Sequence, residues 1–400
     1  MVRNVATFFL IISLIISCTS AEIVRITPGS GSVSSTQIHD ATMGANNSVI
    51  FATDNGLSIY FCDSGSWRIM HPDYSNREAG IHDNFILAVE PDRYGNGWFG
   101  YPDALQVYDG NTFTTVKEPY ILYKNSINDL QLRKDEIWAA VGKSGLIRFG
   151  NSSYEWFQPF RESGLNAHRI ISLAVDPEDD RLIAVSYSGG AWALEENEGT
   201  YSFKQIPVPS GEKILKGVRS DPYGGVFIFS DKNIYRYRGG SVSHFISVDA
   251  IDRLNVSHIN DVTVSREGVV IVATDDGIAG YFNSEMVLRL KNRDGLGGYS
   301  VRFLYTDADG RIWYSVRDNA GYIYPLSDHL RTEIPVPSAG TVQPETTETA
   351  IVSAYADIDA AGETGETTTE DTEGGDMLAE ITGFFSSLWD TLMKPPQEII

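Results

Sequence analysis

Cysteine is scarce in this chain, since only Cys18 and Cys62 occur among 400 residues. A fold held together by a framework of disulfides is therefore excluded. Basic residues are also few, with 31 Lys and Arg against 53 Asp and Glu and a net charge of −22. Binding to nucleic acid depends on clustered Lys and Arg at the phosphates, so this balance argues against a nucleic-acid partner.

Long apolar runs are missing beyond the N-terminus. The run from Val5 to Ser17 follows the charged start Met1-Val2-Arg3 and is short for a bilayer span, which is typical of a secretory signal. We expect residues 1–21 to be a signal peptide and the mature protein to be exported to the cell surface or a periplasm-like space. Two processing routes fit: Ile15-Ile16-Ser17-Cys18 resembles a lipobox with lipidation of Cys18, and cleavage after Ala21 is the alternative.

Aromatic residues and glycine are abundant, with 18 Phe, 20 Tyr, 7 Trp and 37 Gly, which suits short strands and tight turns. The chain also repeats itself about every 44 residues. Each unit holds a short apolar strand, a polar turn and a second, very apolar strand. These second strands are Ser48–Gly56, Gly95–Gly100, Asp135–Ala140, Arg181–Val185, Gly225–Phe229, Gly268–Gly277 and Gly310–Tyr314.

A unit of this size cannot bury both of its faces alone and must stack on its neighbours. We therefore predict an all-β fold, a seven-bladed β-propeller with four-stranded antiparallel blades over residues 22–336. The β-prone segment Glu22–Ile26 precedes the first unit, and we expect it to pair with the last blade and close the ring.

Several units resemble the two-component-regulator propeller repeat. Ala52-Thr53-Asp54-Asn55-Gly56-Leu57 and Ala273-Thr274-Asp275-Asp276-Gly277-Ile278 match one part of that repeat. Asp307-Ala-Asp-Gly310 with Trp313, and Asp92 with Gly95 and Trp98, match its tryptophan-containing form. The resemblance implies a propeller of the kind that often forms the extracytoplasmic sensor of a hybrid histidine kinase, here without the kinase part.

The composition changes after about residue 336. Residues 338–376 hold ten Asp or Glu and no Lys or Arg, so we expect residues 337–375 to be a disordered acidic linker rich in threonine. Residues 376–394 place apolar side chains at three- and four-residue steps, which predicts an amphipathic helix, followed by a tail over 395–400. That helix could contact a partner, itself or a membrane surface.

Ligands of propellers usually bind on the face formed by the interblade loops and the turns between strands two and three. The interblade loops are long here, and aromatic rings beside oriented polar groups suit a protein, peptide or glycan ligand. The candidate ligand-binding residues in or beside these loops are Tyr74, His82, Tyr120, Tyr123, Arg161, His168, Arg253, His258, Arg293 and Tyr299. For each of them the alternative is an ordinary solvated loop side chain.

Other polar residues recur at fixed points of the repeat. His39, His82, His168 and His258 stand before inner strands, but no closely spaced histidine pair exists, and we expect neither a metal site nor a cofactor. Asp40, Asp129 and Asp261 occupy one position of their units, which predicts a repeated hydrogen bond to the next blade.

No nucleophile motif or catalytic pair stands out in the sequence. We therefore expect a non-catalytic recognition or scaffold module, with a glycan hydrolase or lyase acting on the same face as the alternative. Asn46, Asn151 and Asn255 begin Asn-x-Ser sequons and are candidate glycosylation sites on an exported protein.

Overall fold

A computed structural model describes residues 22–331 apart from 30, 77–79, 151–152, 188–189, 210–211 and 213. The predicted signal peptide with Cys18, the linker, the C-terminal helix and the tail lie outside these residues. Within the described part, no helix has the length and apolar character needed to cross a membrane.

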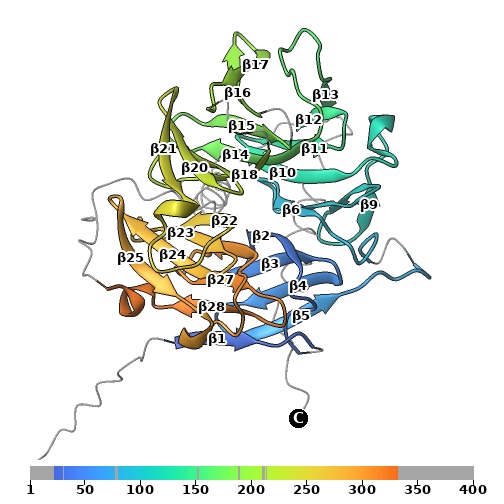
Figure 1. Cartoon of the computed structure of the whole chain (residues 1–400). Helices are drawn as coiled ribbons and strands as arrows, with labels where there is room; N and C mark the ends of the chain where they lie inside the picture. Colours follow the sequence, from blue (N-terminus) through green and yellow to red (C-terminus); the bar gives the residue numbers. More distant parts are fainter. Residues whose placement is uncertain are drawn as a thin grey trace, which may run out of the picture.

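The described chain forms seven four-stranded antiparallel sheets arranged as the blades of a ring, which confirms the predicted propeller (Figure 1). The strands, blade by blade, are β2 (Ile38–Gly44), β3 (Ser48–Thr53), β4 (Gly56–Phe61) and β5 (Ser66–Met70); β6 (Ala88–Pro91), β7 (Gly97–Gly100), β8 (Leu105–Tyr108) and β9 (Phe113–Thr115); β10 (Ile127–Arg133), β11 (Glu136–Val141), β12 (Gly145–Gly150) and β13 (Ser153–Phe157); β14 (Ile170–Asp176), β15 (Arg181–Ser186), β16 (Gly190–Asn197) and β17 (Thr200–Ile206); β18 (Leu215–Ser220), β19 (Val226–Ser230), β20 (Asn233–Arg238) and β21 (Ser241–Ser247); β22 (Ile259–Val264), β23 (Val270–Thr274), β24 (Gly277–Phe282) and β25 (Glu285–Leu290); and β26 (Phe303–Thr306), β27 (Ile312–Ser315), β28 (Ala320–Tyr324) and β1 (Glu22–Ile26). The 3₁₀ turns are η1 (Tyr120–Leu122), η2 (Val248–Ala250), η3 (Asn292–Asp294) and η4 (Leu326–His329).

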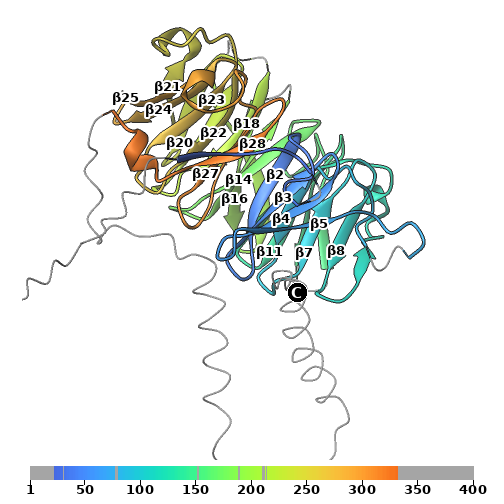
Figure 2. The same ribbon diagram turned by 90° about the horizontal axis from the view of Figure 1, so that it is seen from below.

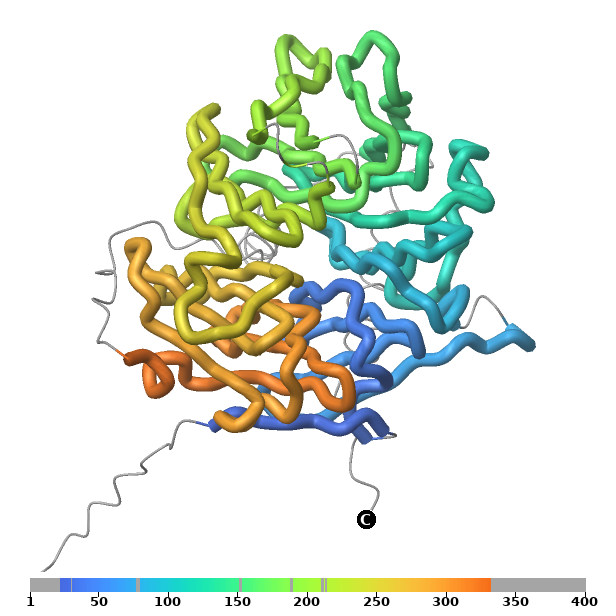
Figure 3. The backbone as a smooth tube through the Cα atoms, in the orientation of Figure 1, coloured from blue at the N-terminus to red at the C-terminus, as the bar shows by residue number. Residues whose placement is uncertain are grey.

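The ring is closed by its N-terminal strand. β1 pairs antiparallel with β28 over five residue pairs, from Glu22 opposite Tyr324 to Ile26 opposite Ala320. The first described strand therefore completes the last blade, as predicted, and Figure 3 shows this blue strand along the edge of the orange last blade.

The hydrophobic core is divided among the blade interfaces. Each of the seven apolar clusters in the described residues draws its side chains from two neighbouring blades. Phe51 and Tyr60 of blade 1, for example, pack edge-on against Trp313 of blade 7. No blade buries its core alone, so each one depends on both of its neighbours.

The repeated aspartates fasten the blades together, as predicted. Asp40 accepts the backbone N–H of Ala41 in its own strand at 2.9 Å and that of Val89 in the next blade at 2.9 Å. Asp129 makes the same pair of bonds to Leu130 and Leu173, and Asp261 makes them to Val262 and Leu304.

A second set of interblade bonds comes from bulged residues. In five blades the pairing between the first and second strands contains a β-bulge. The bulged residue directly precedes the position that these aspartates occupy in their own blades. Three bulged side chains, Asn128, Lys216 and Asn260, each donate at 2.7 Å to a carbonyl of the next blade. Both sets of bonds hold the inner strand of one blade against the inner strand of the next blade.

The turns between strands one and two are held by their own side chains. Asp307 accepts the backbone N–H groups of Asp309 and Arg311 and, through its other oxygen, the indole N–H of Trp313 at 2.8 Å. Asp92 holds Trp98 in the same way. The Asp-x-x-Gly and tryptophan elements of the repeat are therefore structural in these two blades.

Candidate functional site

The antiparallel order of the strands assigns every loop to one of two faces. Because the strands run from one face to the other (Figure 2), interblade loops and the turns between strands two and three lie on one face, which we call the interblade-loop face. Eleven large hydrophobic side chains are exposed among the described residues. Eight belong to the interblade-loop face: Tyr74, Phe85, Tyr120, Tyr123, Phe160, Tyr187, Ile214 and Tyr299. The exposed apolar side chains of the described residues therefore lie mainly on this face.

The predicted site residues occupy three parts of this face. Tyr120, Tyr123, Arg161 and His168 are exposed and lie in the loops that lead into blades 3 and 4. Arg253, His258, Arg293 and Tyr299 are exposed in the loops that lead into blades 6 and 7. Tyr74 and His82 belong to the loop between blades 1 and 2, where His82 lies 3.2 Å from Asp103.

The loops around blades 3 and 4 combine aromatic and basic side chains. We define the aromatic–basic sector as residues 116–126, 142–144, 158–169 and Tyr187. Tyr120 and Tyr123 lie with their ring centroids 6.0 Å apart, and Lys124 lies over the Tyr123 ring at 5.2 Å. Arg169 lies over the Tyr187 ring at 4.9 Å.

The same sector links its loops by direct contacts. The ring of Phe160 lies 4.7 Å from that of His168 within one interblade loop. The backbone N–H of Tyr187 donates to the carbonyl of Arg169, and that of Gly142 donates to Ser126. These contacts join residues 116–126 to 142–144, and residues 158–169 to Tyr187, in the neighbouring loops that lead into blades 3 and 4.

The cations of this sector have no ion-pair partner within the part of the chain that the structure describes. Lys117, Lys124, Lys143, Arg161 and Arg169 are all exposed, and none has a carboxylate within 4.0 Å among the described residues. Glu118 and Glu162 are the acidic residues of the sector, against these five basic ones. In a chain of net charge −22, this is a local excess of positive charge.

The loops leading into blades 6 and 7 differ in this respect. Lys291 pairs with Asp276 at 3.0 Å, Arg253 with Asp252 at 3.1 Å, and Arg293 lies 3.9 Å from Asp294. His258 lies 3.7 Å from Asp231, which also pairs with Lys216. Arg302 and Arg317 on this half are exposed and have no carboxylate within 4.0 Å among the described residues. The same loops and turns also carry six acidic residues, namely Asp249, Asp252, Asp275, Asp276, Asp294 and Asp318, so this half of the face attracts an anion less strongly.

Sequence reasoning missed part of the sector. Lys143 and Tyr187 stand in turns between strands two and three, whereas every predicted site residue lies in or beside an interblade loop. Phe160 and Arg169 lie beside predicted residues, and both have positive φ angles, of 57° and 52°. Bulky residues rarely adopt that conformation, so their placement was not readable from the local pattern.

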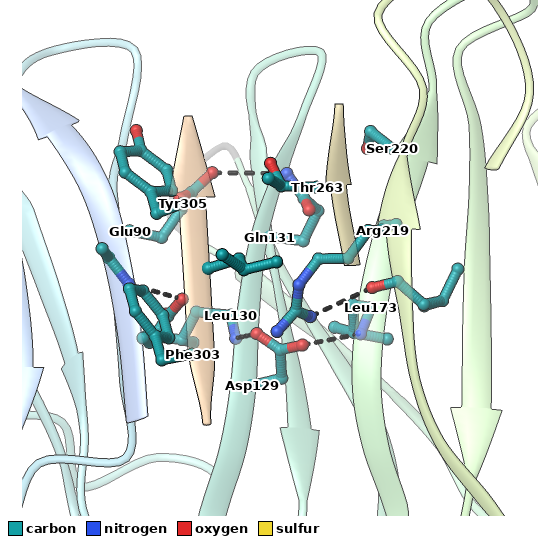
Figure 4. Close-up of a pocket in the computed structure, with 15 residues that line it drawn as sticks. Glu90, Asp129, Leu130, Gln131, Leu173, Arg219, Ser220, Thr263, Phe303 and Tyr305 are labelled. Atoms are coloured by element: carbon teal, nitrogen blue, oxygen red, sulfur yellow. Dashed lines mark hydrogen bonds between the residues drawn. The ribbon is translucent and has the colours of Figure 1, made fainter. Parts of the chain in front are cut away.

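The centre of the ring is a small polar channel. A cavity of about 150 Å³ is lined by inner-strand side chains, among them Asp40, Glu90, Asp129, Arg219 and Tyr305 (Figure 4). Arg219 lies 3.1 Å from Asp261 and, among the described residues, is the one cation that lines this cavity beside Asp40, Glu90 and Asp129. Burial raises the pKa of Asp40 well above its usual range and that of Asp129 to about 6.

Glu90 makes stability depend on pH. Burial raises its pKa to about 7 from an ordinary value of 4.5, so the folded state holds this proton more tightly than the unfolded state. The stability from this proton is present below about pH 4.5 and is lost as pH rises through 7, a change of roughly 3 kcal/mol. We expect the free energy of unfolding to fall between pH 5 and pH 8, and Glu90→Gln to reduce that fall. Urea denaturation across this range measures both.

The remaining predictions concern the histidines, a metal site and the glycosylation sequons. His39 packs against Phe85 at 4.8 Å, and burial lowers its pKa. No group of three or more His, Cys, Asp or Glu side chains within the described ranges could hold a metal ion. Asn46 and Asn255 are exposed, whereas Asn151 lies outside the described residues.

Comparisons with known proteins bear on the fold. No family model matches the chain, and no curated protein matches its sequence. Solved structures do match. The extracellular domain of a protein described as a hybrid two-component system of B. thetaiotaomicron superposes with a TM-score of 0.59 at 17% identity, over 73% of this chain and 40% of that one. A domain described as part of a one-component system of the same organism gives 0.60 at 16% identity, over 76% and 40%.

A propeller enzyme matches at a comparable level. A catalytically inactive variant of virginiamycin B lyase from Staphylococcus aureus, solved with quinupristin, gives a TM-score of 0.55 at 12% identity, over 76% of this chain and 98% of that one. The chain is thus similar in fold both to sensor domains and to a lyase, and it spans about 40% of the sensor chains. At these identities the likeness establishes the seven-bladed propeller alone.

Proposed function

We propose that this protein is an exported, non-catalytic recognition module that serves as an extracytoplasmic sensor component and binds its ligand on the interblade-loop face. The observation that carries the proposal is the aromatic–basic sector, where exposed aromatic rings stand beside five cations that have no carboxylate partner among the described residues. The fold shared with extracellular domains of regulator systems supports the sensor role.

The sector suits a ligand with both negative charge and apolar surface. Exposed Tyr and Phe rings offer flat apolar area at low entropic cost, and unpaired Lys and Arg can bind carboxylate, sulfate or phosphate groups. A glycan, peptide or protein that carries acidic groups has these properties. The remaining predicted residues, Tyr74, His82, Arg253, His258, Arg293 and Tyr299, would then form the rim of the same face.

A triple substitution tests this assignment. Replacing Tyr123, Arg161 and His168 by alanine should weaken ligand binding at least tenfold while leaving the melting temperature within a few degrees, because all three side chains are exposed. Binding is measured on arrays of acidic and neutral glycans and peptides, followed by titration of each hit.

A matched control uses exposed residues of the outer strands. Tyr154 on β13 and Lys204 on β17 are 46% and 74% exposed, and their alanine variant should bind as the natural chain does. Equal loss of affinity in both variants would show that the sector is not the site. Chemical turnover of a bound ligand would instead support the alternative, a hydrolase or lyase.

A further inference from the structure

We propose that the acidic segment Glu345–Glu373 of the same chain docks on the aromatic–basic sector and competes with external ligands. The inference rests on the proposed function in that it uses the same surface. It names an occupant that the chain itself carries.

The charges of the two parts are complementary. Glu345–Glu373 contains nine Asp or Glu and no Lys or Arg. The sector carries five exposed cations without carboxylate partners among the described residues and only two acidic residues, whereas six Asp offset the five Lys and Arg of the loops and turns over blades 6 and 7. An acidic segment is therefore attracted to the sector more than to the rest of the face.

The segment also offers apolar side chains to the exposed rings. Ile351, Val352, Tyr355 and Ile358 lie within a stretch of eight residues that is flanked by acidic residues on both sides. Tyr120, Tyr123, Phe160 and Tyr187 are between 41% and 76% exposed on the sector. Contact between the two sets removes apolar surface from water, which adds to the electrostatic attraction.

The chain is long enough to reach. The last described residue, Arg331, is held at blade 6, where its N–H donates to the carbonyl of Val287 at 2.8 Å. Asp357 lies 26 positions further along the chain, and a chain of that length, if disordered as its composition predicts, spans roughly 28 Å on average and about 86 Å when stretched. A folded unit of this size is about 50 Å across. The sector therefore lies within reach of the tethered segment.

Because the segment is tethered to the propeller, even weak docking on the sector competes with external ligands. A flexible linker produces an effective concentration of about 1 mM, so a segment that binds with a Kd of about 100 μM lowers the apparent affinity of a competitor roughly tenfold. The propeller would then respond only to ligands that displace its own chain.

A binding experiment with the full chain tests the proposal. The probe is a fluorescent peptide with the sequence of residues 345–373, and the proteins are the natural chain and a variant with the nine acidic residues of that segment changed to Gln or Asn. We expect the peptide to bind the neutral-segment variant about tenfold more tightly than the natural chain, and 0.5 M NaCl to abolish binding. Equal affinities, or binding to neither protein, would overturn the proposal.

A second variant locates the contact. Adding Lys124→Gln, Arg161→Gln and Arg169→Gln to the neutral-segment variant should weaken peptide binding at least tenfold, and unchanged binding would contradict docking at the sector. Carbodiimide coupling of the natural chain should join Lys117, Lys124 or Lys143 to the acidic segment in preference to Lys134 and Lys204, which are 50% and 74% exposed.

Cross-linking a mixture of isotope-labelled and unlabelled chains distinguishes docking within one chain from docking between two chains. Cross-links within one chain support the proposal, whereas cross-links mainly between chains assign the sector to a second copy and overturn it. If the segment does not dock, the triple variant should still lose affinity for external ligands. The proposed function and this inference are therefore refuted by different experiments.

Discussion

The Arg219→Met variant should unfold about 3 to 5 kcal/mol more readily than the natural protein at pH 8. Arg219 lies in the central channel and pairs with Asp261, and Asp40 and Asp129 also raise its pKa. Methionine fills much of the same volume but leaves the buried carboxylates without a cation. The loss should therefore come from charge and not from a cavity.

The pH dependence of that loss identifies its cause. Without Arg219 the pKa values of Asp40 and Asp129, already raised by burial, should rise further. At pH 5 these groups can take up protons, so the destabilisation should shrink there. Urea denaturation at pH 5 and pH 8 measures the difference, and Glu90→Gln added to Arg219→Met should restore part of the stability at pH 8. An equal loss at both pH values would point to packing instead.

The pairing of β1 with β28, which closes the ring, should be disrupted by a single methyl group added on β28. A Cβ added at Gly321 on β28 would lie 2.0 Å from the carbonyl oxygen of Val24 on β1 and 2.8 Å from the hydroxyl of Tyr314. Val24 and Tyr322 are paired in this ladder, so the two strands would have to separate. We expect Gly321→Ala to cost about 3 kcal/mol and to lower the melting temperature.

A matched substitution controls for the change of glycine itself. Nothing lies within 4 Å of a Cβ added at Gly31, so Gly31→Ala should leave the stability nearly unchanged. Hydrogen exchange of β1 and β28 locates the effect. Exchange that rises evenly over all blades, with no early loss of protection in these two strands, would contradict a defect at the closure.

Much of the fold could be predicted because it repeats. Seven apolar strands at regular spacing fixed the number of blades, and the position of Glu22–Ile26 before the first unit predicted the closing strand. The interblade bonds of Asp40, Asp129 and Asp261 followed from their equal places in the repeat.

The site could be predicted only in part, since its properties depend on which blades are neighbours. Arg161 and Arg253 look alike in sequence, but Arg253 has Asp252 at 3.1 Å and Arg161 has no such partner among the described residues. The sequence around Arg219 likewise does not indicate that four other blades place carboxylates near its guanidinium. Such contacts arise only when the ring closes.

The most direct test of the central claim is the affinity of an acidic array ligand for three forms of the full chain. These are the natural protein, the triple variant of Tyr123, Arg161 and His168, and the control variant of Tyr154 and Lys204. We predict a hit list dominated by acidic compounds, with affinity lost in the triple variant and kept in the control. A hit list without preference for acidic compounds, or affinity kept in the triple variant, would contradict ligand recognition by the aromatic–basic sector.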